Sequence, residues 1–465
     1  MYDYITNEST IIFSPYYNKS IDANLLLTYN KIIFSNYELN ENLFLKYSNN
    51  DFIDLKCSNS IFDQPIILPP NITLITFGKY FDQPVELPPN IVHLTFGTYF
   101  NQPVELPPNI VHLTFGTYFN QSVKLPQNIT HLTFGTYFNQ SVKLPLNITH
   151  LTFGYNFNNK VKLPENITNL IIVGHYFNKK IKLPKNITHL TLDGPIIQPV
   201  KLLPYISNLI FGFRFNQLIK LPTNMTNLTH LTFGNSFDQQ IKLTQNITHL
   251  TFGISFNKPI ELTQNITHLT FGFCFNQPIE LSPNITHLTF GSCFNQLIKL
   301  SPNITLINFG SYFNQPIELP PNLTHLTFGN YFNQQIKLPE NLKCLTFGDC
   351  FNQQIKLPEN LKCLTFGDCF NQPIVLPNNL NIITFGFYFD QKVDFPFGIK
   401  YLKLCDDDAH NLDYLPEGIE VLELGKYFNS SLNNLPNSLK LIKLYRYYKG
   451  SLKCIPSNTK IVYIE

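Results

Sequence analysis

The sequence of 465 residues contains no tryptophan and only two alanines, Ala23 and Ala409. Alanine is the strongest helix former, so its scarcity argues against long helices. The 42 phenylalanines and 24 tyrosines, together with abundant isoleucine and threonine, favour β-strands instead. Since 43% of the residues are apolar, the chain can still bury a continuous core. We therefore expect a mainly β protein with little helix.

The chain also has little net charge and no long apolar run. Its 33 lysines and arginines nearly balance 31 aspartates and glutamates, which gives a net charge of +2. Such a balance provides no general attraction to nucleic acid or to an acidic membrane, so we expect neither as a partner. No apolar stretch approaches the ~18 residues of a membrane span, and the N-terminus lacks the basic and apolar regions of a signal peptide.

Common catalytic motifs are missing as well. The sequence has no G-x-x-x-x-G-K-S/T, G-x-G-x-x-G, H-E-x-x-H or G-x-S-x-G segment. Its nine cysteines include no C-x-x-C pair. We therefore expect no catalysis, no cofactor, no metal site and reduced thiols. Six cysteines form pairs one repeat apart, which copying explains: Cys274 with Cys293, Cys344 with Cys363, and Cys350 with Cys369.

What the chain does have is a repeat. A 19-residue unit close to L-P-x-N-I-T-H-L-T-F-G-x-x-F-N-Q-P-I-E/K recurs over most of its length. A short fixed period indicates a solenoid, in which each coil buries its apolar face against its neighbours. One phenylalanine marks each regular copy: Phe81, Phe100, Phe119, Phe138, Phe157, Phe237, Phe256, Phe275, Phe294, Phe313, Phe332, Phe351, Phe370 and Phe389.

Within one coil, Ile110, Leu113 and Phe115 have the L-x-x-L-x-L spacing of a leucine-rich-repeat strand. Strict alternation then points His112 and Thr114 outward. We expect Gly116 to permit the tight turn that ends the strand. The frequent prolines exclude a helix on the outer side. The prediction is a right-handed solenoid with one parallel strand per coil and an extended, proline-rich outer wall.

The period defines three expected regions. Residues 1–51 keep no period and are expected to form an irregular N-terminal cap, since a terminal coil would expose its core. The solenoid is expected over 52–445, with its first strand at Phe52–Cys57 and irregular coils at 170–233, where an insertion near Met225 changes the spacing. Residues 446–465 are expected to form a C-terminal cap.

The run Phe-Asn-Gln-Pro-Ile at 275–279, repeated near 100–104, 294–298 and 313–317, resembles the FNIP repeat. Proteins of that family occur mainly in social amoebae and giant amoeba-infecting viruses. The resemblance covers roughly residues 62–445 and implies a curved solenoid used for protein interaction. Some members carry an F-box, which implies a second possibility: a substrate receptor of a ubiquitin ligase, docked through residues 1–50. That segment lacks the amphipathic helices of an F-box.

The location also follows from the asparagines that begin each N-I-T step. In a secretory route each would be a glycosylation site. Adjacent sugars would lie one coil apart, about 5 Å, which leaves no room for them. We therefore expect a cytoplasmic protein, in the host cytoplasm if the chain is viral.

A column of histidines and a column of threonines form the candidate site. Both are expected on the concave face of the solenoid, one strand spacing apart. The histidine column contains His93, His112, His131, His150, His189, His230, His249, His268, His287 and His325. The threonine column contains Thr95, Thr114, Thr133, Thr251, Thr270 and Thr289.

Four interpretations of these columns remain open. They can be the contact surface for a partner protein, a row of ligands for Zn²⁺ or Cu²⁺, a pH sensor, or residues inherited by copying. A row of parallel side chains offers at most two ligands to one ion, which weakens the metal interpretation. We expect a monomeric, non-enzymatic scaffold that binds a partner protein through this face.

Two further features bear on that scaffold. The asparagines before each strand (Asn90, Asn109, Asn128 and Asn147) are expected to bond the backbone of the next coil. Specificity is expected where the pattern fails, at the irregular coils and where other residues replace the ladder histidine: Leu74, Asn169, Asn208, Leu306, Cys344 and Cys363.

Overall fold

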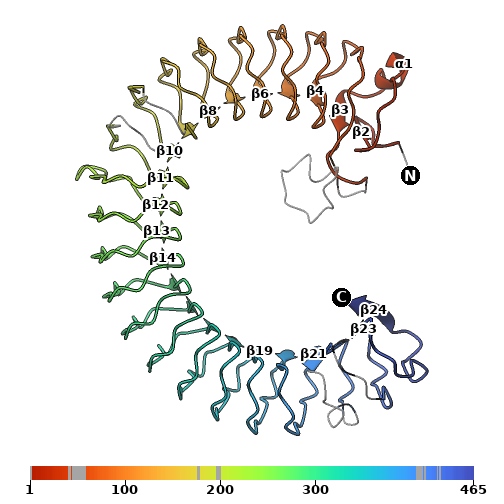
Figure 1. The fold of residues 1–465 in the computed structure, drawn as a ribbon, viewed down its shortest axis with the longest axis vertical. Helices are drawn as coiled ribbons and strands as arrows, with labels where there is room; N and C mark the ends of the chain where they lie inside the picture. The colour runs from red at the N-terminus through yellow and green to blue at the C-terminus, as the bar shows by residue number, and fades with distance from the viewer. Residues whose placement is uncertain are drawn as a thin grey trace. The chain divides into compact units, whose positions relative to one another are not determined.

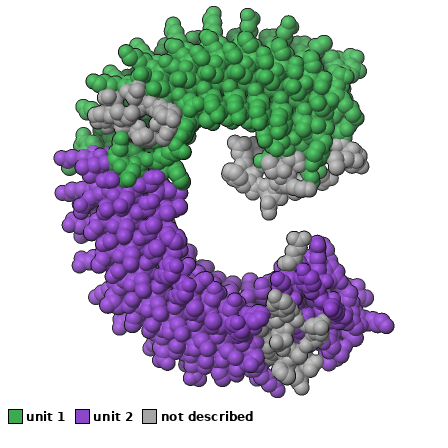
Figure 2. All heavy atoms as spheres, in the orientation of Figure 1, with its two compact units in different colours: residues 1–217, 221–228, 232–234 green, residues 218–220, 229–231, 235–465 purple. Residues whose placement is uncertain are grey.

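The computed structural model describes residues 3–39, 43, 59–174, 179–194, 201–404, 412, 415–426, 428 and 431–464. It divides into two compact units (Figure 2). Unit 1 comprises residues 1–217, 221–228 and 232–234, and unit 2 comprises residues 218–220, 229–231 and 235–465. The predicted first strand at Phe52–Cys57 lies outside the described residues.

Each coil contributes one short strand, as predicted. In the coil described above, Ile110, Leu113, Phe115 and Phe119 are all buried, so the apolar spacing does set the inward face. Within each unit the strands lie side by side along the inner edge of the row of coils (Figure 1). Turns and irregular extended segments connect them. The chain is therefore a mainly β solenoid.

Unit 1 contains a short helix and eleven of the strands. The helix is α1 (Ala23–Leu26). The strands are β1 (Tyr4–Thr6), β2 (Thr10–Phe13), β3 (Lys31–Phe34), β4 (Leu74–Thr76), β5 (His93–Thr95), β6 (His112–Thr114), β7 (His131–Thr133), β8 (His150–Phe153), β9 (Asn169–Ile172), β10 (His189–Leu192) and β11 (Asn208–Phe211).

Strand β12 (His230–Phe233) has residues assigned to both units. The strands of unit 2 are β13 (His249–Phe252), β14 (His268–Thr270), β15 (His287–Thr289), β16 (Leu306–Asn308), β17 (His325–Thr327), β18 (Cys344–Thr346), β19 (Cys363–Thr365), β20 (Ile382–Thr384), β21 (Tyr401–Leu404), β22 (Val421–Leu424), β23 (Leu441–Tyr445) and β24 (Lys460–Ile464).

Successive strands pair in parallel and in a constant register. For example, His112 of β6 pairs with His93 on one side and His131 on the other. The same register holds from β13 to β24 in unit 2, where His268 pairs with His249 and His287. Equivalent residues of neighbouring coils therefore form straight columns across the sheet.

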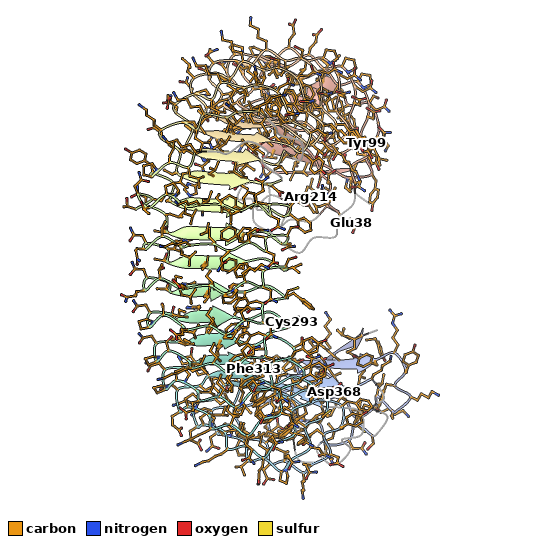
Figure 3. All side chains as sticks on the ribbon, turned by 60° about the vertical axis from the view of Figure 1, so that its left-hand side comes forward. Glu38, Tyr99, Arg214, Cys293, Phe313 and Asp368 are labelled. Atoms are coloured by element: carbon orange, nitrogen blue, oxygen red, sulfur yellow. The ribbon has the colours of Figure 1, made fainter. Side chains whose placement is uncertain are left out.

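Stacked phenylalanines fill the core. The ring of Phe115 lies 3.8 Å from that of Phe119 in the same coil and 5.6 Å from that of Phe134 in the next. Phe313 in unit 2 (labelled in Figure 3) is fully buried and continues the same arrangement. Because each ring contacts its own coil and both neighbours, the core is continuous within each unit.

The repeat glycines are required for a different reason from the predicted one. Among the described glycines, only Gly194 and Gly418 have a positive φ, so the other described glycines are not needed for a left-handed turn. A Cβ on Gly116 would instead overlap the carbonyl oxygen of Gly97 in the preceding coil. The same overlap occurs at Gly291 against Gly272. Close approach of the coils therefore selects glycine.

The parallel sheet begins inside the segment expected to be an irregular cap. Strand β2 pairs in parallel with β3, and β3 pairs in parallel with β4. The apolar runs Ile11–Phe13 and Ile32–Phe34 make these strands, and they are buried. The three-residue β1 pairs antiparallel with β2 and covers its free edge.

The insertion near Met225 makes an extra turn. Met225 and Leu228 are both buried, and the Met225 amide donates to the Pro222 carbonyl at 3.2 Å. The added residues therefore extend the core of unit 1.

Candidate functional site

The histidine column lies on the strand face of both units, as predicted. In unit 1, His93, His112, His131 and His150 occupy consecutive strands, and their ring centroids lie 4.1–4.5 Å apart. In unit 2, the rings of His230, His249, His268 and His287 stack at 4.2 Å. The structure thus brings eight of the ten predicted histidines into two stacked rows of four.

The other two histidines stand apart from these rows. His189 pairs in register with Asn169 and Asn208. His325 pairs with Leu306 and Cys344. The predicted exceptions to the repeat therefore end the rows.

Threonine hydroxyls fix the orientation of the rings that follow a threonine in the sequence. The Thr149 hydroxyl donates to the Thr130 carbonyl at 3.2 Å and lies 2.9 Å from His150 Nδ1. Thr267 and His268 repeat the pattern at 3.2 and 2.9 Å. Since the single hydroxyl hydrogen goes to the carbonyl, Nδ1 must carry the hydrogen of the second bond. Each such neutral ring therefore keeps an unprotonated Nε2, which is a hydrogen-bond acceptor.

Burial keeps these rings neutral. It lowers the pKa of His131 to about 4, and the neighbouring His112 and His150 add to the shift. Burial, as the largest cause, also lowers the pKa of His93, His112, His150, His249 and His268. At neutral pH these rings therefore carry no charge.

The threonine column lies beside the histidines. Thr95, Thr114 and Thr133 follow one another in register in unit 1. Thr251, Thr270 and Thr289 do the same in unit 2. All six side chains are partly exposed, so they contribute to the same surface as the histidines.

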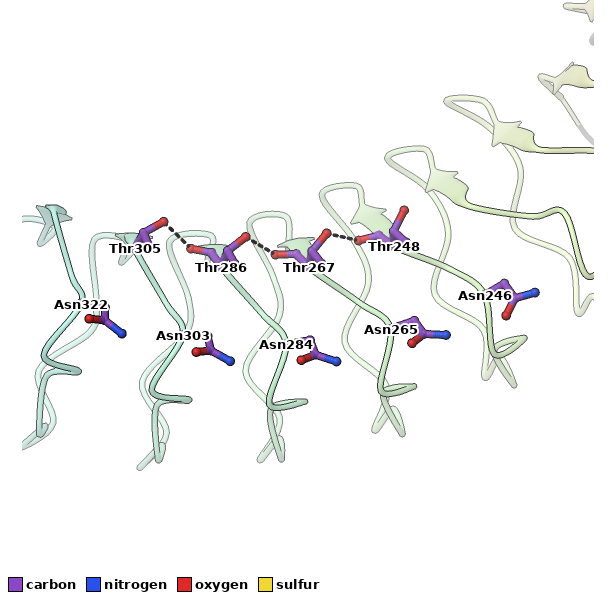
Figure 4. A pocket seen from close by; sticks show the side chains of 9 residues that line it. All are labelled: Asn246, Thr248, Asn265, Thr267, Asn284, Thr286, Asn303, Thr305 and Asn322. Carbon is purple, nitrogen blue, oxygen red and sulfur yellow. Dashed lines mark hydrogen bonds between the residues drawn. The ribbon is translucent and has the colours of Figure 1, made fainter.

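A shallow groove of about 710 Å³ runs along unit 2 beside this face. Figure 4 shows its threonines linked in a row by hydrogen bonds, such as Thr286 Oγ1 to the Thr267 carbonyl at 3.2 Å. Its asparagines are also engaged, since Asn284 Nδ2 donates to the Gln264 carbonyl at 2.9 Å. These side chains therefore hold adjacent coils together.

The asparagines before the strands do bond the backbone of a neighbouring coil, but it is the preceding one. Asn109 Nδ2 donates to the Pro89 carbonyl at 3.0 Å, and Asn128 Nδ2 to the Pro108 carbonyl at 3.0 Å. Asn90 and Asn147 bond Pro70 and Gln127 in the same way.

A second asparagine column escaped the sequence interpretation. Asn276 Oδ1 accepts from the Asn295 amide at 2.9 Å and from Gln296 Nε2 at 3.1 Å. The F-N-Q step of the repeat carried the signal, because a recurrent polar pair beside a core phenylalanine needs hydrogen-bond partners.

The described residues contain no group of three or more histidines, cysteines, aspartates or glutamates placed to hold a metal ion. The seven cysteines within the described ranges are free thiols. No helix in those ranges has the length and apolar character needed to cross a membrane.

The chain is similar to known repeat proteins. A family model described as the FNIP repeat matches residues 62–194, 256–387 and 410–444. The crystal structure of CroV588, described as a novel circular leucine-rich-repeat protein, is 35% identical, with a TM-score of 0.75 over 98% of this chain and 72% of that one. YopM from Yersinia enterocolitica is 19% identical, with a TM-score of 0.41 over 88% of this chain and 86% of that one. No curated protein sequence matches.

Proposed function

The chain belongs to the FNIP repeat family, and from that premise we propose that it is a non-catalytic scaffold that binds a partner protein. The binding surface is the strand face that carries the histidine and threonine columns. Leucine-rich-repeat-like solenoids offer extended surfaces of this kind for protein interaction.

The fixed, neutral imidazoles are the observation that carries this proposal. In the coils of His150, His249 and His268, Nδ1 is bonded to a threonine hydroxyl, so each of these coils presents one Nε2 acceptor at the same position. A partner gains about 0.5–1.5 kcal/mol from each hydrogen bond of this type. Several coils acting together provide useful affinity, whereas one coil does not.

The adaptor alternative has less support. Within residues 3–39 the chain forms three strands and the four-residue helix α1. An F-box docking segment needs a succession of amphipathic helices. We therefore favour the plain scaffold.

The test compares two variants that alter opposite sides of the same coils. The face variant carries His249→Ala, His268→Ala and His287→Ala. The control carries Glu261→Ala, Glu280→Ala and Lys299→Ala, at exposed positions on the outer side of those coils. Each protein, immobilised, captures partners from an amoeba lysate.

We expect a protein that the wild type and the control retain and the face variant loses. Circular dichroism melting checks that all three chains are folded. A captured protein that is lost with the outer-side variant and retained by the face variant would contradict the proposal.

A further inference from the structure

An apolar pocket of about 250 Å³ opens on the strand face of unit 1, across β8 to β11. Its lining includes Ile171 and Ile210, with His189 between Asn169 and Asn208. In β5–β8 and β12–β15 the face is a regular surface of histidine and threonine. The pocket therefore marks a local departure from the repeat.

Two substitutions in alternate coils produce the pocket. Asn169 and Asn208 take the place of the ladder histidine on either side of His189. Because a carboxamide is smaller than an imidazole, both changes open space beside the His189 ring. The same two coils replace the ladder threonine with isoleucine, and Ile171 is 38% exposed. The two coils that lack the ladder imidazole therefore also supply the apolar walls of the pocket.

The size of the pocket selects its occupant. Sites for drug-sized molecules usually measure about 300–1,000 Å³. A cavity of about 150 Å³ is enough for a benzene ring. The pocket therefore suits one bulky side chain. None of the described residues that line it is a lysine, arginine, aspartate or glutamate, so a charged occupant would lose its hydration without compensation.

The polar groups around the pocket suit an extended polypeptide. The Thr188 hydroxyl donates to the Thr168 carbonyl at 3.2 Å and lies 2.9 Å from His189 Nδ1, which leaves Nε2 as an acceptor. The Thr168 hydroxyl lies 3.3 Å from the Thr149 carbonyl oxygen and 2.8 Å from the Asn169 carboxamide, whose other polar atom therefore faces away from that hydroxyl. Adjacent coils thus offer hydrogen-bonding groups beside the pocket, which an extended backbone can match with its N–H and C=O groups.

We propose that this pocket anchors an extended segment of the partner protein by one bulky, uncharged apolar side chain, such as leucine, isoleucine, methionine or phenylalanine. The inference rests on the proposed scaffold function and deepens it, because it assigns the anchor to β8–β11. The histidine rows add contacts along the same face.

The test uses a displayed library of random peptides, selected on the immobilised full chain. The pocket variant carries Ile171→Thr and Ile210→Thr. Thr152 and Thr191 hold the same position in the adjacent strands, so the variant keeps the regular repeat and should fold. The matched control is Ile382→Thr, which removes a 40% exposed isoleucine from the strand face of unit 2.

We expect selection to enrich peptides that share one bulky apolar residue. Their affinity should fall at least about tenfold on the pocket variant and stay unchanged on Ile382→Thr, because burying such a side chain is worth more than a factor of ten. Replacing the shared residue by aspartate should abolish binding. Equal binding to the wild type and the pocket variant, or no enrichment of apolar peptides, would overturn the proposal.

This readout is separate from the capture experiment on unit 2. If capture depends on His249, His268 and His287 while no peptide depends on Ile171 and Ile210, the anchor is wrong and the scaffold function stands. If partner capture also does not depend on these histidines, both the anchor and the proposed scaffold function are wrong.

Discussion

The ladder histidines make the stability of the folded chain depend on pH. Burial, followed by repulsion from His112 and His150, lowers the pKa of His131 to about 4, whereas an unfolded histidine titrates near 6.5. Below pH 6.5 the unfolded chain therefore binds more protons than the folded one. The stability contribution is complete above pH 6.5 and is lost as the pH falls from there towards 4.

We therefore predict that the melting temperature falls between about pH 7 and pH 5, before most carboxylates titrate. Circular dichroism melts at several pH values measure this. The variant His131→Gln, which cannot take up a proton, should lose less stability over the same range. An identical pH dependence in both chains would contradict the assignment.

The repeat glycines make a second prediction for single residues. Gly291→Ala places a methyl group against the Gly272 carbonyl, which is backbone and cannot rotate away. We expect a destabilisation of about 1–3 kcal/mol or more, the range for overpacking. At Gly398 the nearest atom to the added carbon is the Asn378 carbonyl oxygen at 3.1 Å, so Gly398→Ala should cost less.

Urea denaturation gives both values from the shift in midpoint. Equal midpoints for Gly291→Ala and the wild type would show that the coils are further apart than the structure has them.

The role of a residue could be predicted from the sequence where it depends on spacing within one coil. It could not be predicted where it depends on a contact between two neighbouring coils. The spacing of Ile110, Leu113 and Phe115 was enough to identify the core. The reason for Gly116 required the distance to Gly97. The threonine–histidine bonds also escaped the sequence interpretation, because a hydroxyl's role follows from the carbonyl that the preceding coil presents to it.

At the level of whole strands, β21 to β23 replace the neutral columns with charge. Glu423 lies between Lys403 at 2.9 Å and Lys443 at 3.0 Å, and Tyr401 donates to it at 2.8 Å. Burial alone would raise the pKa of Glu423, but hydrogen bonds from both lysines and the tyrosine outweigh it and lower the pKa to about 2. Its side chain is only 11% exposed. This carboxylate joins three adjacent strands.

We predict that Glu423→Gln destabilises the chain by about 1–3 kcal/mol, since it leaves two half-buried lysines without their partner. The neighbouring Glu420→Gln is the control. Glu420 bridges Lys400 and Lys440 at the surface, and its replacement should have a smaller effect.

Urea denaturation at neutral pH measures the difference. The Glu423 contribution is present above its unfolded pKa near 4.5 and is lost as the pH falls towards 2. In strong acid, Glu423→Gln and Glu420→Gln should therefore have similar free energies of unfolding. A larger loss for Glu420→Gln would refute this ranking.

The strands themselves were predictable wherever the period holds. One strand per coil, parallel pairing and little helix all followed from the repeat and its prolines. Strands β2 and β3 could not be assigned to the parallel sheet from the period, because their spacing differs from that of the repeat, although Ile11–Phe13 and Ile32–Phe34 carry the apolar signal of strands. Asn169 and Asn208 were recognised as exceptions, but the pocket also needed Ile171 and Ile210, whose meaning appears only when alternate strands lie in register.

For the molecule as a whole, the proposed function implies that partner binding is a sum over coils. Each coil interacts mainly with its neighbours, so a substitution on one strand leaves distant strands intact. We predict that His249→Ala and His287→Ala each weaken partner binding by about 0.5–1.5 kcal/mol and that the double variant shows nearly the sum. Titration calorimetry with the captured partner measures the three affinities. A single variant that abolishes binding would indicate a concentrated site in place of a distributed one.

The most direct test of the strand face as the binding surface is chemical footprinting of the histidines with diethyl pyrocarbonate. This reagent acylates unprotonated imidazole nitrogens. The account predicts that His249, His268 and His287 are modified in the free protein and protected when the captured partner is bound. Unchanged modification of these rings in the complex, with protection of Lys299 on the outer side, would contradict it.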